Sequence, residues 1–376
     1  MGVDWSGGMR QSFELVEVDA DTWTEGAEHG ELVSATVTYE DEGQLCSAEL
    51  ESDEQFSTGY YRLYIVAEQG DEAERVPIAT VLCESDTLSS DGKHATYDAT
   101  GYSPLKELDD TAPRIGWAVG SGTSVMTAVK AVLSEHCRAP KSYAVSSTAT
   151  CESYVAEEDD SWLDVVEDLL AQVSAHLEVD GWGRVLVVPD TDASALSPAV
   201  TWTDSPGDGE ASVSLPDLDV DFDRADVPNR YEAVLSEDSS FIVAAAQNDD
   251  PASEVSTVSR GRVVLERDTS PDVDDGCTQE QLEQYALDML AEATQQTVTY
   301  TYQRGFWPGV HVGTCVELVR ELAGVTATGV ICKQVISCET GCSVEETVER
   351  SAGLDAELSA ADFYEGSGAG DEEDDD

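Results

Sequence analysis

GYYRLYIVA, residues 59–67, is the stretch that decides how the N-terminal part of this chain folds. Large apolar side chains recur at every second position, so Tyr61, Leu63, Ile65 and Ala67 fall on one face of an extended segment. Side chains return to the same face every two residues in a β-strand, whereas they do so about every 3.6 residues in an amphipathic helix. We therefore predict a half-buried strand here, with one face in a core.

Three further stretches share this alternation, namely ELVSATVTY (31–39), VPIATVLC (76–83) and HATYDATGY (94–102). One face of the first stretch carries Val33, Ala35, Val37 and Tyr39. The segments between the stretches are acidic and contain Gly and Ser, as turns do. Residues 1–103 therefore predict an antiparallel, β-barrel-like or sandwich domain.

The period changes in the middle of the chain, which predicts a small α/β module over residues 104–215. Apolar residues recur at helical spacing over 124–136 and again over 161–177. Ser161 stands where a residue capping the second helix is expected. Residues 178–189, EVDGWGRVLVVP, have the pattern of a hairpin.

Strand patterns return over residues 216–345, which predict a second β-barrel-like region with one inserted helix at 277–294. Thr278 is placed to cap that helix. Residues 346–376 are rich in Asp and Glu and predict a flexible, disordered acidic tail. The expected fold class is therefore β-rich α+β, with two antiparallel β-barrel-like domains flanking a small α/β module.

The charge balance excludes several kinds of partner. The chain has 78 Asp and Glu residues against 19 Lys and Arg, which gives a formal net charge of −59. Tight binding to DNA or to an anionic membrane needs clustered Lys and Arg, and the sequence has no such cluster. The sequence contains no run of about 18 apolar residues, so we expect no transmembrane helix and no membrane anchor. An acidic host proteome and selection for a repulsive surface both remain explanations of the acidity.

Metal and phosphate sites lack the residue spacing that they need. The nine cysteines include no CxxC pair, and the tightest group, Cys332, Cys338 and Cys342, favours buried reduced thiols over zinc ligands. The glycine-rich stretch 116–124 lacks the Gly-Lys-Ser/Thr ending of a Walker loop. We expect no cofactor and no metal.

Two other motifs have a structural interpretation that we prefer. Asp219, Asp221 and Asp223 have calcium-loop spacing, but the glycine and glutamate that such a loop requires are missing, which favours the exposed face of a strand. A Cys137 and His136 pair would suit a cysteine hydrolase, yet no nucleophile motif surrounds it. We therefore expect a protein without catalytic residues.

Three groups of segments, in order along the chain, resemble the tail-tip or baseplate hub proteins of long-tailed phages and prophages. The first is WSGGMRQSFELVEVDADTW (5–23) with YYRLYIVAEQGDEAERVPIATVLCES (60–85), and the second is SWLDVVEDLLAQVSAHLEVDGWGRVLVVP (161–189). The third runs from VPNRYEAVL (227–235) to TVTYTYQRGFWPGVHVGTCVEL (297–318).

The resemblance implies a structural hub at the distal end of a phage tail. Such a hub is a homotrimer in which two barrel-like domains per subunit match a hexameric tube. Its expected partners are the tail tube or distal tail protein and a receptor-binding or needle protein, with DNA passing through its channel without adhering. The expected location is the tail tip of the virion, after assembly in the host cytoplasm.

We also expect a subunit or tube interface at Trp5, Met9, Arg10 and Phe13, in the first of the matching segments. The alternative function is that of an extracellular β-domain adhesin or carbohydrate-binding module from an organism with an acidic proteome. A cysteine hydrolase using Cys137 is a third hypothesis.

Overall fold

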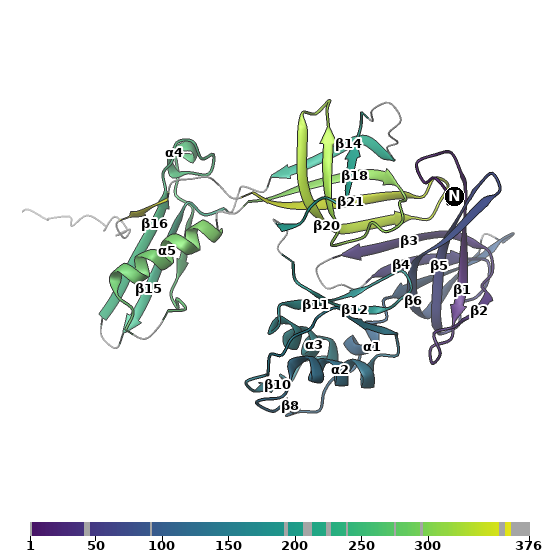
Figure 1. The fold of residues 1–376 in the computed structure, drawn as a ribbon, viewed down its shortest axis with the longest axis horizontal. Coiled ribbons are helices and arrows are strands. Elements are labelled where there is room, and N and C mark those ends of the chain that lie inside the picture. Colours follow the sequence, from purple (N-terminus) through teal and green to yellow (C-terminus); the bar gives the residue numbers. More distant parts are fainter. Residues whose placement is uncertain are drawn as a thin grey trace, which may run out of the picture. The chain divides into compact units, whose positions relative to one another are not determined.

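The computed structural model divides into two compact units (Figure 1). The first comprises Met1–Asp219 and Tyr300–Glu349, and the second comprises Val220–Thr299 and Arg350–Asp376. The structure describes residues 2–40, 46–90, 92–191, 195–205, 213–222, 227–237, 240–273, 276–293, 296–352 and 358–361. The four-part division at residues 103, 215 and 345 stays a prediction.

The N-terminal strands follow the alternation of the sequence. They are β1 (Arg10–Val18), β2 (Glu25–Glu28), β3 (Leu32–Glu40), β4 (Ser47–Ser52), β5 (Gly59–Gln69), β6 (Glu72–Ser90) and β7 (Ala95–Tyr102). β5 lies between β1 and β6, antiparallel to both. The four strands predicted here are confirmed. Val33 is an exception to the predicted face, because a shift of register between Leu32 and Ser34 leaves it 52% exposed.

A second group of strands completes the same sheet. It consists of β13 (Val200–Thr203), β14 (Ser214–Phe222), β18 (Gln296–Gly305), β19 (Cys315–Arg320), β20 (Val325–Ser337) and β21 (Ser343–Ala352). β20 pairs with β3, with Ile336 opposite Val37, and so joins the two β regions directly. The strand order is β14-β18-β21-β20-β3-β4-β7-β6-β5-β1-β2, with β19 also on β20 and β13 on β19. In the part of the chain that the structure describes, no sheet closes on itself, and the barrels are not confirmed.

The core of the first unit draws on both β regions. Leu63 and Ile65 of β5 pack in one cluster with Ile336 and Val344. The opposite face of β5 is buried as well, because Tyr60, Arg62 and Tyr64 are each at most 3% exposed. The prediction of a half-buried strand was therefore wrong for β5: both of its faces are covered, and the second lies toward the α/β module.

The α/β module packs three helices against a small sheet (Figure 1). Its helices are α1 (Lys106–Asp109), α2 (Val125–His136) and α3 (Trp162–Ala171). Its strands are β8 (Ala118–Val119), β9 (Lys141–Tyr143), β10 (Tyr154–Val155), β11 (Ala175–Val179) and β12 (Val185–Pro189). β12 pairs antiparallel with β11 and parallel with β9, while β8 and β10 form a separate pair. The predicted α/β character is confirmed.

The helix predicted over 161–177 is α3, which begins as predicted and ends earlier. Ser161 and Asp164 form a reciprocal capping box. The helix stops at Ala171, and Ser174 then turns the chain with a φ of 50°. His176, which lies within the helical pattern predicted over 161–177, consequently belongs to β11. The apolar run misled the prediction because helix and strand share it without a break.

The second unit is a small sheet with one long helix across it (Figure 1). Its strands are β15 (Arg230–Glu237), β16 (Ser240–Asn248), β17 (Leu265–Asp268) and β22 (Leu358–Ala361), in the order β17-β15-β16-β22. Its helices are α4 (Thr257–Arg260) and α5 (Gln279–Ala293). Leu282, Ala286 and Leu290 of α5 pack on this sheet.

The predicted cap of α5 is confirmed, since Thr278 and Gln281 exchange hydrogen bonds. Within the predicted tail, residues up to Ala352 belong to β21 and Leu358–Ala361 form β22. Residues 353–357 and 362–376 of that tail lie outside the described residues. Across the described ranges, every helix is too short or too polar to cross a membrane.

Candidate functional site

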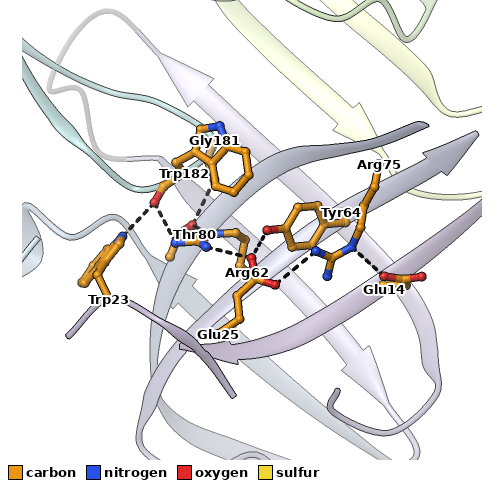
Figure 2. Close-up of polar contacts among 9 residues, drawn as sticks. All are labelled: Glu14, Trp23, Glu25, Arg62, Tyr64, Arg75, Thr80, Gly181 and Trp182. Atoms are coloured by element: carbon orange, nitrogen blue, oxygen red, sulfur yellow. Dashed lines mark hydrogen bonds and ion pairs between the residues drawn. The ribbon is translucent and has the colours of Figure 1, made fainter. Parts of the chain in front are cut away.

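A buried arginine holds the α/β module to the sheet. The side chain of Arg62 points from the second face of β5, and the residue is 3% exposed. Its guanidinium donates from Nε to Thr80 Oγ1 at 2.8 Å, from Nη1 to Glu25 Oε1 at 3.1 Å and from Nη2 to the carbonyl oxygen of Trp182 at 3.0 Å (Figure 2). A charge taken out of water is tolerated when it is paired and hydrogen-bonded in this way.

The partner of this arginine is the turn between β11 and β12. Thr80 Oγ1 donates to the carbonyl oxygen of Gly181 at 2.9 Å, and Trp23 Nε1 donates to that of Trp182 at 2.9 Å (Figure 2). The turn lies so close to the sheet that a Cβ on Gly181 would stand 2.4 Å from the carbonyl oxygen of Pro77. Only glycine fits this approach, which explains the Gly-Trp-Gly sequence of the turn.

A second arginine extends the network along the sheet. Arg75 donates to Glu14 at 2.7 Å and to Glu25 at 3.1 Å, and its guanidinium stacks over the ring of Tyr64 at 3.4 Å (Figure 2). Burial would raise the pKa of Glu25, but hydrogen bonds from Tyr64 and Arg75 outweigh it and hold that pKa below its usual value. Two arginines and two glutamates thus balance each other at this junction.

A comparable buried network lies inside the C-terminal β region. Arg304 and Glu346 are 1% and 0% exposed and form an ion pair at 2.5 Å. Gln334 donates to Glu346 at 2.5 Å and to the carbonyl oxygen of Val310 at 3.2 Å, and Tyr302 also donates to Glu346. The loop that contains Val310 is fixed to the sheet by this network.

An apolar cavity of about 340 Å³ opens between the sheet, the β11–β12 turn and the loop after β18. Aromatic and aliphatic side chains form most of its wall: Tyr39, Ile78, Trp182, Leu186, Phe306, Trp307, Val310, Val312 and Ile336. A volume of this size lies at the lower end of the range of about 300–1,000 Å³ that is usual for ligand pockets. Trp182 is 43% exposed, so an aromatic ring stands at its margin.

Carboxylates on the rim of the cavity have cationic partners of their own. Glu40 pairs with Lys333, and Asp180 pairs with Arg184 at 2.6 Å. Glu178 shares the imidazole of His176 with a further carboxylate, Asp190, at 3.4 Å and 2.6 Å respectively. The hydrogen bond to Glu178 raises the pKa of His176, and the hydrogen bond to Asp190 adds to this effect. Burial acts in the opposite direction, and the resulting pKa is about 9.

The residues predicted to form an interface are placed mostly inside their own subunit. Trp5 is 8% exposed, with its ring 5.5 Å from that of Phe306. Met9 and Phe13 pack against the same core and are partly buried. The side chain of Arg10 is 81% exposed and lies 3.6 Å from Glu68. The interface stays a prediction, with Arg10 as the member that projects into solvent.

The candidate chemical motifs do not assemble into a reactive site. Burial raises the pKa of Cys137 to about 11, so the thiol is protonated at neutral pH, and His136 stacks on Trp162 at 4.2 Å. Asp219 and Asp221 are exposed along β14, as expected of a strand face, while Asp223 is outside the described residues. Among the residues that the structure describes, no group of three or more His, Cys, Asp or Glu side chains is placed to hold a metal.

The sequence interpretation missed the residues that hold the β11–β12 turn to the sheet, which are Arg62, Thr80, Gly181 and Trp182. A signal existed in GYYRLYIVA, because Tyr60 and Tyr64 are large side chains on the face assigned to solvent. Bulky residues on both faces are typical of a strand that is covered on both sides.

Comparison with known proteins supports the resemblance at the level of the fold. No protein-family model matches the chain, and no curated protein sequence matches it. The structure of a tail protein from Neisseria meningitidis MC58 matches 90% of this chain and 96% of its own length, with a TM-score of 0.61 at 13% identity. A 43 kDa tail protein of prophage MuSo2 from Shewanella oneidensis matches 89% of this chain and 98% of its own, with a TM-score of 0.58 at 14% identity. This chain has the fold of phage tail proteins.

Proposed function

We propose that this chain is a non-catalytic structural hub at the distal end of a phage tail. It joins the tail tube to receptor-binding or needle components and works as a homotrimer that forms part of the DNA channel. It becomes part of the virion after assembly in the host cytoplasm. One observation carries this proposal: the fold match extends over nearly the whole of both chains, so it is not limited to a common β motif.

The joined sheet supports a role as a ring subunit. The N-terminal and C-terminal β regions are the two parts that a pseudo-sixfold ring requires, and β3 and β20 pair them within one subunit. The ion pairs of the buried arginines Arg62 and Arg304 fix the parts within the first unit by directional contacts. A rigid subunit of this kind suits a closed assembly better than a catalytic site that must open.

One face of the N-terminal sheet suits a channel wall. A polar groove of about 330 Å³ crosses β3, β4, β6 and β7. It is lined by Glu49, Glu51 and Asp98, with Leu50, Ala99 and the hydroxyls of Ser34, Thr36, Thr87 and Thr100. DNA adheres to proteins chiefly through Lys and Arg, and the lining of this groove contains neither. Such a wall repels phosphates and lets DNA pass.

The oligomeric state tests the hub directly. One chain has a formal net charge of −59, so three chains together carry −177. We therefore expect association to strengthen as salt screens the repulsion between the chains. Mass photometry at low and at near-molar salt should show a trimer that is favoured by salt. A monomer under every condition, including after addition of the tube protein, would refute the proposal.

The channel is tested by DNA ejection from phages that carry Glu49→Lys and Glu51→Lys. We expect slower ejection, because the new ammonium groups bind passing phosphates, and partial recovery as the salt concentration rises. Glu157→Lys with Glu158→Lys makes the same change of charge on an exposed loop of the α/β module and serves as the matched control. Equal ejection rates in the wild-type phage, the Glu49→Lys/Glu51→Lys phage and the control phage would contradict a channel role for this face.

A further inference from the structure

A rigid turn at the edge of the α/β module carries an exposed apolar side chain beside an unpaired cation. The amide of Trp117 donates to the carbonyl oxygen of Arg114 at 2.9 Å, and Gly116 has the positive φ of 75° that such a turn needs. Ile115 stands at the corner of this turn and is 84% exposed. In the described part of the chain, Arg114 forms no ion pair and no side-chain hydrogen bond.

Arg114 belongs to the minority of described arginines that have no carboxylate partner. The chain has 19 Lys and Arg residues among 78 acids, and most of the described arginines bind a carboxylate. Arg114 instead lies next to the exposed Ile115, so the pair presents an apolar side chain with a positive charge at its base. A complementary surface would be an apolar hollow with a negative charge at its rim.

The cavity beside Trp182 has that character. Its wall is apolar, and negative charge exceeds positive charge at Glu178 on the rim, because Glu178 shares the single imidazole of His176 with Asp190, which lies behind it. The other rim carboxylates, Glu40 and Asp180, are neutralised by their own cations. A second acidic chain can therefore approach here with less repulsion than over most of the surface.

The turn and the cavity lie at different ends of the module. β8, which follows the turn, lies at the far end of the module from β11 and β12, whose connecting turn forms one wall of the cavity (Figure 1). The two surfaces also differ from each other, and a contact between different surfaces of identical chains is head-to-tail. Head-to-tail contacts generate closed rings when the rotation between subunits closes.

We propose that the Arg114–Ile115 turn of one copy docks into the cavity of the next copy, with Ile115 in the apolar hollow and Arg114 at Glu178. This contact rests on the proposed homotrimer and names the surfaces that hold it together. Trp182 can contact the incoming turn without a change of backbone position. Arg62 and Trp23 fix its carbonyl oxygen by hydrogen bonds, and the residue remains 43% exposed at the margin of the cavity. Tryptophan and arginine are among the residue types that most often dominate binding at protein interfaces.

The test uses the full-length chain and mass photometry over a range of concentrations, with thermal unfolding to confirm that each variant folds. Ile115→Ser and Arg114→Glu should each weaken association, and loss of the buried isoleucine corresponds to roughly 10- to 100-fold in the dissociation constant. Val312→Phe fills the cavity and should have the same effect. Leu322→Ser is the matched control, because Leu322 is a 97% exposed leucine on another turn.

Mixing two defective variants separates this contact from other ways of associating. Ile115→Ser keeps an intact cavity and Val312→Phe keeps an intact turn, so the mixture should form a species with the mass of two chains although neither variant associates alone. The docking is refuted if the wild type is a trimer and these variants remain trimeric, and the hub proposal then stands. A wild type that is monomeric at every concentration and salt, and also after addition of the tube protein, refutes both.

Discussion

Replacing Arg62 with methionine removes the charge that fixes the β11–β12 turn and keeps most of the buried stem. The variant loses two hydrogen bonds from a charged donor, to Thr80 Oγ1 and to the carbonyl oxygen of Trp182, and one ion pair to Glu25. Hydrogen bonds to charged groups contribute about 1.5–3 kcal/mol each, and a half-exposed ion pair contributes about 1 kcal/mol or less.

The acceptors that Arg62 leaves behind keep other partners, which limits the loss. The carbonyl oxygen of Trp182 still accepts from Trp23, and Glu25 still accepts from Tyr64 and Arg75. No acceptor is left buried and bare, so we expect the lower end of the range, about 3 kcal/mol in the free energy of unfolding.

Equilibrium unfolding in urea measures this loss, with Arg10→Met as the matched control. Arg10 has an 81% exposed side chain and one long ion pair, so its replacement should change the free energy of unfolding by less than about 0.5 kcal/mol. A double-mutant cycle of Arg62→Met with Thr80→Val should show coupling of about 1 kcal/mol or more. If the free energy of unfolding of Arg62→Met is within about 1 kcal/mol of the wild-type value, the guanidinium does not hold the module in place.

Three further substitutions test other contacts. Gly181→Ala should cost about 1–3 kcal/mol in unfolding experiments because its Cβ meets the backbone of Pro77, whereas Gly120→Ala, with open space around it, should be near neutral. The raised pKa of His176 contributes stability that is complete below about pH 6.5 and is lost as the pH rises through about 9, so His176→Gln should flatten the pH dependence of unfolding in that window; an unchanged profile would contradict it. Glu346→Ala breaks a fully buried ion pair and should lower the free energy of unfolding by about 3–5 kcal/mol, which a loss below about 1 kcal/mol would exclude.

Local patterns predicted the individual elements of this chain well. Alternation located β5 and β7, and the spacing of Ser161 and Thr278 gave two helix starts that the structure confirms by hydrogen bonds. These signals work because the period of a strand and the cap of a helix depend on residues within one or two turns of each other.

The arrangement of those elements depends on contacts that no local pattern encodes. Arg62 looks like a solvent-facing residue of a half-buried strand until Trp182, 120 residues later, covers it. The predicted separation into two barrel-like domains overlooked the pairing of Ile336 with Val37 for the same reason. The contact of Trp5 with Phe306 in the core likewise joins residues that are remote in sequence, so no local pattern indicated it.

The pairing of β3 with β20 also has a consequence for biosynthesis. Thr36 and Ser337 face each other across this pair, so the ribosome must add 301 residues after the first before the second exists. At about 5–20 residues per second, that delay is roughly 15–60 s. During this time one edge of β3 has no strand beside it, and unpaired edges recruit other chains. The dense negative charge of the nascent chain would keep neighbouring copies apart over this interval, so the acidity protects the protein while it is being made.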